Sequence, residues 1–404
     1  MTHLYIHIPF CQRRCAYCDF NTYAHSEQHI AAYVDALCAE LGMLVALRPP
    51  PSASPEAAAL GDTIFFGGGT PTMLSLKQFE RILAAATPLV PLEHAEISCE
   101  ANPGTVLNLS YLRGLRSLGI NRLSLGVQSL DDATLRRLGR IHSAAEAQQS
   151  YTQARQAGFT HVNLDLIFGL PTQSLEQWQR TLTTIATWQA EHLALYALTV
   201  EEATPLHAQV ASGQLAIPDD DATATMYEVA MESLAAAGYL QYEISNWGWG
   251  GATPGVSGVR GGLGPPRTPD TACRHNLAYW LNSDYLAAGA GAHGHGYPQR
   301  YANLRAIGDY IAAVQAGTRP VGEALDLTPH DLYAETMLMG MRLNMGVSAS
   351  HFAARCGRSL DATYGPVLAE LVAQGLIERT AERVYLTPRG RMLANQVCMR
   401  FLYD

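Results

Sequence analysis

Three cysteines near the start of the chain have the spacing of a metal site. Cys11, Cys15 and Cys18 form a C-x3-C-x2-C array directly behind a strand-like stretch. Cysteine thiolates at such short spacing bind zinc or an iron–sulfur cluster. A structural zinc site needs a fourth ligand; no second C-x2-C pair follows, so His7 or His25 would have to supply it. Three thiolates on a four-iron cluster instead leave one iron open, and an open position keeps a metal site chemically available.

Other residues suited to ligand binding lie where strand-like stretches end. Residues 67–71, Gly-Gly-Gly-Thr-Pro, overlap and follow the second such stretch. Polar side chains end or occupy three further stretches, namely Glu100, Gln128 and Asp165. Ligands of parallel α/β folds bind outside the carboxyl ends of the strands. We therefore expect these residues and the cysteines to share one site.

The elements that must position this site alternate between strand and helix. Six strand-like stretches are separated by helical patterns, at 4–10, 62–68, 95–102, 122–129, 161–170 and 192–200. Apolar residues recur at helical spacing in Ile30, Tyr33, Val34, Leu37, Leu41 and Leu44, and more weakly in Leu109, Leu112, Leu115 and Leu118. This alternation predicts a parallel sheet covered by helices, either open or curled into a barrel.

The rest of the chain changes character twice. Residues 247–272 hold eight glycines and four prolines, which predicts a flexible insert, with a lid over a nearby site as the alternative. From about residue 305, helical patterns follow without strands until a strand, a turn and a final helix. This order predicts a small winged-helix-like module that serves as a cap or a docking module. It lacks a basic recognition helix, so DNA binding is not expected.

Composition and charge narrow the class of protein. Of the 404 residues, 48% are hydrophobic and 16% are charged, which predicts a globular chain with a large core. The net charge of −9 argues against a nucleic-acid-binding protein. We find no signal peptide and no stretch of about 18 continuous apolar residues. Eight cysteines are too sparse for a disulfide scaffold, so we expect a cytoplasmic protein whose cysteine cluster binds metal or is catalytic.

The cysteine loop resembles that of a known superfamily. "PFCQRRCAYC" and "FFGGGTPT", one βα unit later, are similar to the cluster loop and glycine-rich stretch of radical S-adenosylmethionine enzymes. The resemblance implies an α/β fold with a partial (β/α)6 barrel, and a [4Fe-4S] cluster on Cys11, Cys15 and Cys18. It also implies S-adenosylmethionine on the open iron, where the reduced cluster cleaves the sulfonium to a 5′-deoxyadenosyl radical.

A narrower resemblance covers nearly the whole chain except the Gly/Pro-rich insert. "YIHIPFC", "EISCEANP", "RLSLGVQS", "NLDLIFGLP" and "LTPRGRMLANQVCMRFL" are similar to oxygen-independent coproporphyrinogen III oxidase and its paralogues. By motif position it implies S-adenosylmethionine contacts from Tyr5, Tyr17, Gly68, Gly69, Thr70, Glu100, Gln128, Arg140 and Asp165. The alternatives are structural: ion pairs of the two carboxylates with arginines, a backbone contact for Gln128 and a core position for Tyr5.

The same resemblance divides the chain. Residues 1–246 are expected to form the radical S-adenosylmethionine core and 247–272 the insert. Residues 273–304 are expected to carry a haem motif and close the core, and 305–404 to form a small, α-rich C-terminal domain.

Three features separate the branches of this family. The oxidases carry a further cysteine where Phe20 stands here, after Asp19. They also have a long segment before the cluster loop, whereas the first cysteine here is residue 11. The stretch 275–280, His-Asn-Leu-Ala-Tyr-Trp, is similar to the H-N-x-x-Y-W motif of the HemW group of haem chaperones, in which the histidine is implicated in holding haem. Without that resemblance, His275 reads as a core or capping histidine.

Three neighbouring residues are weighed as further haem ligands. Cys273 is interpreted as a bystander, with a thiolate co-ligand as the alternative. His293 and His295 lie between glycines and are considered for the second side of the haem, although histidines in loops usually ligate nothing.

The resemblance implies a haem chaperone that delivers haem to haem-requiring respiratory proteins. The alternatives are coproporphyrinogen III dehydrogenase and a radical enzyme with another substrate. We expect no coproporphyrinogen oxidase activity, while S-adenosylmethionine cleavage stays open. The expected partners are haem, haem-accepting respiratory proteins and, if the cluster is reduced, an electron donor such as flavodoxin or ferredoxin. No nucleic acid is expected, and an acidic chain can still visit a membrane surface through a partner.

Overall fold

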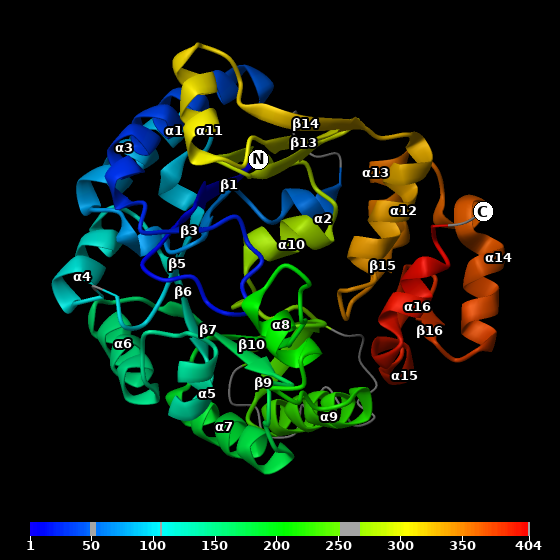
Figure 1. The fold of residues 1–404 in the computed structure, drawn as a ribbon. Helices are drawn as coiled ribbons and strands as arrows, with labels where there is room; N and C mark the ends of the chain where they lie inside the picture. The colour runs from blue at the N-terminus through cyan, green and yellow to red at the C-terminus, as the bar shows by residue number, and fades with distance from the viewer. Residues whose placement is uncertain (49–53, 106, 251–266, 403–404) are drawn as a thin grey trace.

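The computed structural model describes residues 1–48, 54–105, 107–250 and 267–402. Its centre is a curved parallel sheet whose six successive strands are those predicted from the sequence (Figure 1). They are β1 His3–Ile8, β4 Thr63–Gly68, β5 Glu96–Ala101, β6 Arg122–Gln128, β7 His161–Phe168 and β8 His192–Ala197. The predicted parallel sheet, curled into a partial barrel, is thereby confirmed.

Three strands that the alternating pattern did not reveal extend this sheet. Strand β11 (Leu286–Ala288) pairs in parallel with β1 at one edge. At the other edge, β10 (Asn246–Trp249) and β9 (Tyr239–Glu243) form an antiparallel extension beside β8. Within the described residues the strand order is therefore β11-β1-β4-β5-β6-β7-β8-β10-β9.

Amphipathic helices cover the outer face of the sheet, as Figure 1 shows. They are α1 Ile30–Leu44, α3 Leu76–Ala86, α4 Leu109–Ser117, α6 Ala144–Gln156, α7 Leu175–Trp188 and α9 Asp220–Ala236. Reciprocal side-chain and backbone hydrogen bonds at Ser75, Ser143 and Ser174 begin three of them, because each serine is followed three residues later by Gln or Glu. The predicted stripe on α1 is confirmed, since Tyr33, Val34, Leu37, Leu41 and Leu44 are fully buried.

One helical stretch is apolar enough to qualify as a membrane span by composition. Residues 27–47, which include α1, reach a mean hydropathy of 1.8 over 18 residues, although no continuous apolar run of that length exists. The sequence count therefore missed this stretch. Its apolar stripe packs on α3 and on α11 (Ile307–Gln315) in the core. This packing is that of a core helix in a globular protein.

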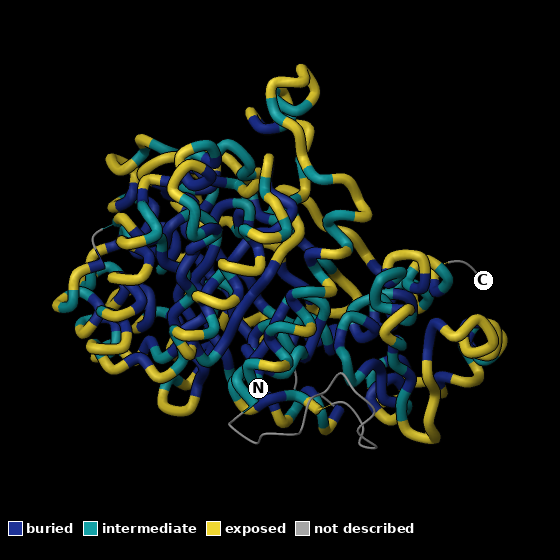
Figure 2. Tube along the Cα trace, turned by 90° about the horizontal axis from the view of Figure 1, so that it is seen from below, coloured by how far each residue is buried: buried dark blue, intermediate teal, exposed yellow. Residues whose placement is uncertain are grey.

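The C-terminal part has its own core. It contains α12 Pro329–Gly340, α13 Ala349–Cys356, α14 Leu360–Ala373, α15 Pro388–Met392 and α16 Ala394–Met399. A small sheet of β15 Val347–Ser348, β17 Arg383–Leu386 and β16 Ile377–Arg379 stands beside these helices. Figure 2 shows this part as a lobe with its own buried interior.

The predicted start of the C-terminal domain at residue 305 does not match this packing. Helix α11 contributes Tyr310 to the barrel core, where its ring lies 5.1 Å from that of Tyr33. The following strand β14 (Val321–Asp326) pairs with β13 (Gln299–Asn303), so a strand stands where only helices were predicted. The separate C-terminal core instead begins near Leu332.

The Gly/Pro-rich insert is shorter than predicted. Strand β10 lies in the central sheet, and Trp247 is 1% exposed because its indole packs into the core despite its glycine neighbours. At the other end, the Thr271 hydroxyl donates to the Trp249 carbonyl oxygen (3.2 Å) and Ala272 is buried. Residues 251–266 of the predicted insert lie outside the described residues.

A buried carboxyl group ties α1 to the edge of the barrel. Glu40 is 1% exposed. It accepts hydrogen bonds from the Tyr310 hydroxyl (2.6 Å), the Asn303 amide (2.6 Å) and the Gly289 backbone N–H (2.8 Å). Burial raises the pKa of Glu40. These bonds fix the chain after β11, which in turn holds the cysteine loop.

Replacing Glu40 should therefore weaken the fold. Glu40→Ala leaves the buried Tyr310 hydroxyl and Gly289 N–H without an acceptor and removes one of the two acceptors of the Asn303 amide, so we expect a loss of about 3 kcal/mol of stability. Glu40→Gln keeps an acceptor and should lose less. Thermal unfolding of both variants measures the difference; equal midpoints for wild type and Glu40→Ala would contradict this role.

Candidate functional site

The cysteine loop leaves the carboxyl end of β1 and is fixed by backbone hydrogen bonds. A short strand, β2 (Phe10–Cys11), pairs with β3 (Tyr23–Ala24). Further along, Ala16 donates from its N–H to the Leu138 carbonyl oxygen (2.9 Å). The Asn21 side chain donates to the carbonyl oxygens of Ala290 and Arg305, each at 3.0 Å. The loop is thus held from three sides of the barrel mouth.

The three cysteines line one open cavity of about 470 Å³, here called the cluster cavity. Seven of the nine predicted S-adenosylmethionine contacts line it as well: Tyr17, Gly68, Gly69, Glu100, Gln128, Arg140 and Asp165. Thr70 lies directly behind it, and its hydroxyl donates to the Cys11 sulfur (3.7 Å). This arrangement agrees with the expectation that the cysteines and the residues at the strand ends share one site.

The donor set of the cluster cavity fits an iron–sulfur cluster better than zinc. Within the described ranges, no three His, Cys, Asp or Glu side chains converge on a point where one ion would sit. A [4Fe-4S] cube takes each thiolate on a different iron, so its cysteines need not converge. Neither His7 nor His25 lines the cavity, and His7 instead contacts the Asn21 carbonyl oxygen (2.9 Å) through its ring. Neither histidine weighed as a fourth zinc ligand is therefore placed to bind a zinc ion there.

Arg140 links two sides of the cluster cavity. Its guanidinium group donates to the Cys15 sulfur (3.5 Å), to the Asn102 side-chain oxygen (2.7 Å) and to the Gly126 carbonyl oxygen (2.7 Å). The Asn102 amide in turn donates to the Thr70 hydroxyl (2.7 Å). The guanidinium group thus places a positive charge beside one of the three loop cysteines. Asn102 was not among the predicted site residues. Its position two residues after Glu100 in "EISCEANP" could have indicated that it lies at the same strand end.

Two glycines let β4 approach the cysteine loop. The Gly69 N–H donates to the Ile8 carbonyl oxygen (2.8 Å), and a Cβ there would lie 2.6 Å from the Phe10 carbonyl oxygen. Gly68 has φ +109°, and a Cβ on it would overlap the His7 ring. Both positions therefore require glycine for the protein's own packing. Both glycines line the cluster cavity, and their N–H groups already donate to Glu100 and to Ile8.

Four acidic side chains line the cluster cavity, and two of them, Glu100 and Asp165, lie on strands of the sheet without an arginine or lysine partner in the described part of the chain. Glu100 accepts from the Gly68 N–H (3.1 Å), and Asp165 accepts from Ser124 (2.8 Å) and Asn163 (2.7 Å). The alternative of structural ion pairs is thus not supported. Burial, and then the neighbouring Asp165, raise the pKa of Glu100 to about 8; burial raises the pKa of Asp165 to about 6. Carboxylate oxygens placed this way suit the hydroxyl groups of a ribose.

Gln128 lines the cluster cavity, whereas Tyr5 lies outside it. Gln128 has φ +65° beside a β-bulge in β6, a left-handed conformation that is uncommon for a residue with a side chain. Such conformations gather at binding sites. Tyr5 does not line the cluster cavity; its ring stacks on Phe65 and its hydroxyl meets the His7 ring at 3.0 Å. Its position is the core-like one weighed as the alternative.

Tyr5 instead lines a second cavity of about 250 Å³ inside the barrel, here called the inner cavity. The inner cavity shares Glu100, Ser124, Asp165 and Tyr196 with the cluster cavity. Its opposite wall is formed by α10 (Arg274–Trp280), which carries His275 and Tyr279. The two cavities thus follow one another from the carboxyl to the amino ends of the strands.

His275 is fully buried, and both of its ring nitrogens have partners. Nδ1 lies 2.7 Å from the Thr63 hydroxyl and Nε2 lies 2.9 Å from the Tyr279 hydroxyl. The ring also stacks on Phe65, with centroids 5.3 Å apart. Burial lowers the pKa of His275, which keeps the imidazole neutral. In this conformation neither nitrogen is free to ligate iron.

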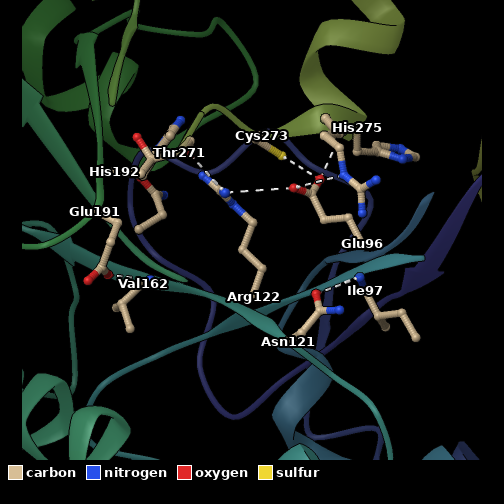
Figure 3. A network of polar contacts seen from close by, with 12 residues as sticks. Glu96, Ile97, Asn121, Arg122, Val162, Glu191, His192, Thr271, Cys273 and His275 are labelled. Carbon is tan, nitrogen blue, oxygen red and sulfur yellow. Dashed lines mark hydrogen bonds and ion pairs between the residues drawn. The ribbon is translucent and has the colours of Figure 1, made fainter. Parts of the chain in front are cut away.

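A polar network anchors α10 to the amino ends of the strands (Figure 3). Glu96 accepts from the His275 backbone N–H (3.0 Å) and from the Cys273 thiol (3.5 Å). Arg122 reaches from β6 to Glu96 (3.7 Å) and donates to the Thr271 carbonyl oxygen (3.0 Å). Cys273 therefore has a structural contact, as a bystander would. Residues 273–280 therefore close the barrel at the amino ends of the strands.

The two other histidines lie elsewhere. His293 is exposed on β12 (His293–Gly296), and His295 is 1% exposed with its Nε2 3.0 Å from the Arg355 guanidinium. Neither lines the inner cavity or the cluster cavity.

Comparisons with known proteins agree with this geometry. Residues 5–185 match the family model described as "Radical SAM superfamily", and residues 327–393 match "HemN C-terminal domain". A protein named "Heme chaperone HemW" from Bacillus subtilis (strain 168) is 36% identical over 404 residues, covering 100% of this chain and 99% of that protein. A protein of the same name from Escherichia coli (strain K12) is 34% identical over 408 residues, covering 99% and 98%.

A solved structure shares the fold. Coproporphyrinogen III oxidase (HemN) from Escherichia coli superposes with a TM-score of 0.78, covering 99% of this chain and 90% of that one. Its sequence identity is 23%, so this likeness concerns the arrangement of the elements.

The cysteines should be needed for the cluster. Anaerobic reconstitution with iron and sulfide should give about four irons per chain, and Cys11→Ser, Cys15→Ser or Cys18→Ser should lose them. Cys38→Ser, on α1 and away from the cavity, is the matched control. Normal iron content and absorption in all three loop variants would refute the assignment.

Glu100 should make stability depend on pH. Its pKa is raised in the folded chain, so its contribution is complete below about pH 4.5 and is lost as the pH rises through about 8. Glu100→Gln should therefore gain about 4 kcal/mol of stability relative to the wild type between about pH 5 and pH 8, which raises its thermal midpoint by roughly 5 °C. Thermal midpoints across this range measure the difference. A constant difference would contradict the shifted pKa.

Proposed function

The chain belongs to the HemW haem chaperones of the radical S-adenosylmethionine superfamily, and on this basis we propose that it binds haem and passes it to haem-requiring proteins. The observation that carries the proposal is the full-length relation to proteins of that name, at 34–36% identity and 94–99% of their length. A shared cluster loop alone would be equally compatible with many radical enzymes.

The cluster cavity supplies the groups that an iron–sulfur cluster and S-adenosylmethionine need. Cys11, Cys15 and Cys18 would hold three irons, and Glu100 and Asp165 would accept hydrogen bonds from ribose hydroxyls. When bound, the reduced cluster would supply one electron to S-adenosylmethionine. Arg140 holds the cavity wall together and keeps a positive charge beside Cys15.

The residue that stands where the oxidases have a further cysteine favours haem transport over porphyrinogen oxidation. Phe20 stands there, lines the mouth of the cluster cavity and is 69% exposed. It supplies an apolar surface instead of a thiol. Coproporphyrinogen dehydrogenation therefore remains the second candidate, supported by the shared fold alone.

Haem ligation by His275 requires α10 to move. His275 must release Thr63 and Tyr279, and α10 must leave the bottom of the barrel. The C-terminal domain also grips the end of this helix: the Arg342 guanidinium lies 4.5 Å from the centre of the Trp280 ring, and the His351 ring contacts the Leu281 carbonyl oxygen (3.0 Å). We propose that His275 becomes an axial ligand when this grip opens.

The partners and the location follow from the same proposal. The acceptors would be haem-requiring respiratory proteins, and a flavodoxin or ferredoxin would reduce the cluster. A cytoplasmic location is supported by the eight cysteines, all of which are free thiols in the structure.

One pair of assays on the same preparation tests the function. Haem titration should give a shifted Soret band, while coproporphyrinogen with S-adenosylmethionine and reductant should not be converted at an enzyme-like rate. Efficient conversion would instead favour the dehydrogenase, and an unchanged haem spectrum would exclude haem binding.

Two variants test His275 as the ligand. His275→Ala should weaken and shift the Soret band, whereas His293→Ala, an exposed histidine of the same region, should not. Tyr279→Phe frees Nε2 from one hydrogen bond worth about 1 kcal/mol and should strengthen haem binding roughly fivefold. Thermal unfolding checks that each variant is folded. Unchanged spectra in His275→Ala, with no gain in Tyr279→Phe, would leave His275 a structural residue.

A further inference from the structure

A third cavity, of about 470 Å³, lies between the barrel and the C-terminal domain and is here called the interdomain cavity. Strand β8 and helix α9 form one wall, and α15 and the start of α16 form the other; these are the green and red elements of Figure 1. Much of the lining is apolar: Phe168, Leu195, Ile244, Met392 and Leu393. Ala197 lines both this cavity and the cluster cavity, so the two are neighbours.

The charged residues of this lining are all positive. Arg342 and Arg391 line the interdomain cavity, and no Asp or Glu does so in the described part of the chain. This is notable in a protein of net charge −9. A cavity that concentrates one sign of charge attracts ligands of the opposite sign.

Neither guanidinium group is fully satisfied by the described residues. Arg391 donates one hydrogen bond to the Gln241 side chain (3.3 Å) and forms no ion pair there. Arg342 reaches Glu243 at 3.5 Å and stacks on Trp280. The Nε atoms of both arginines are buried without a partner. Burial lowers the pKa of Arg391, because no carboxylate compensates its charge. Buried donors left open in this way fit an anionic ligand.

The chemistry of the walls defines that ligand. Apolar residues on both sides suit a large apolar body, and two guanidinium groups suit carboxylates, which they can bind through paired hydrogen bonds. Haem has both parts. We propose that Arg391 and Arg342 bind the propionate carboxylates of haem in the interdomain cavity. This inference rests on the proposed function and deepens it.

The site is separate from His275. Along β8, Leu195 lines the interdomain cavity, whereas the next residue, Tyr196, lines the inner cavity. Side chains alternate between the faces of a strand, so the sheet stands between the two. Haem can therefore dock by its propionates while α10 still closes the barrel.

The test compares haem with haem whose two propionates are converted to methyl amides. The wild type should bind haem about tenfold more tightly than the diamide. Arg391→Gln should bind haem more weakly than the wild type does but should bind the diamide equally well, so it loses the preference for haem. Arg391→Lys should keep part of that preference. Arg400→Gln, an exposed arginine paired with Glu370 in the same domain, is the control and should behave as the wild type.

The outcomes separate this inference from the function on which it rests. Equal binding of haem and diamide by the wild type, or an undiminished preference in Arg391→Gln, would overturn the propionate site while leaving haem binding intact. Failure of the wild type to bind haem would overturn the function and the site together. His275→Ala should keep the preference for haem over the diamide; its loss there would place the propionates at the inner cavity instead.

Discussion

The close approach of β4 to the chain that leaves β1 is the constraint on which the rest of the site depends. The Gly69 N–H bonds the Ile8 carbonyl oxygen at 2.8 Å and the Thr70 N–H bonds the Phe10 carbonyl oxygen at 2.7 Å. These two bonds fix the direction in which Cys11 enters the cavity. They exist because no side chain separates the strands at that point. The glycine run therefore shapes the cysteine loop before it meets any ligand.

At the amino ends of the strands, the segment that closes the barrel is held by charged and hydrogen-bonding groups. Glu96 and Arg122 are both buried, and a buried ion pair gains little stability by itself. Here the two side chains hydrogen-bond the segment that closes the barrel. Arg122 donates to the Thr271 carbonyl oxygen, and Glu96 accepts from the Cys273 thiol and the His275 N–H. If that segment moved away, water could hydrogen-bond the exposed Glu96 and Arg122 side chains. This would cost less free energy than exposing an apolar surface of the same size.

The sequence was sufficient for the parts of the molecule governed by local pattern. The six parallel strands, the buried stripe of α1 and the grouping of the cysteines with Glu100, Gln128 and Asp165 all follow from periodicity and strand ends. Three features did not follow. Strand β10 is ordered by Trp247, against a composition rich in glycine, and α11 joins the barrel through Tyr310 and Glu40. His275 is buried through contacts with Glu96 and Thr63, which lie 179 and 212 residues away in the sequence. Each depends on pairings between distant segments, which a one-dimensional pattern does not record.

The stacking of Arg342 on Trp280 has a consequence for how the two ends of the molecule communicate. The same guanidinium group contacts the helix that closes the barrel, the buried Glu243 and the interdomain cavity. Whatever competes for Arg342 in that cavity must change how firmly α10 is held. Linkage then requires the reverse with equal strength: release of α10 alters the affinity of the cavity by the same factor. If a ligand binds Arg342 in that cavity as proposed, its binding and the release of α10 form one coupled equilibrium.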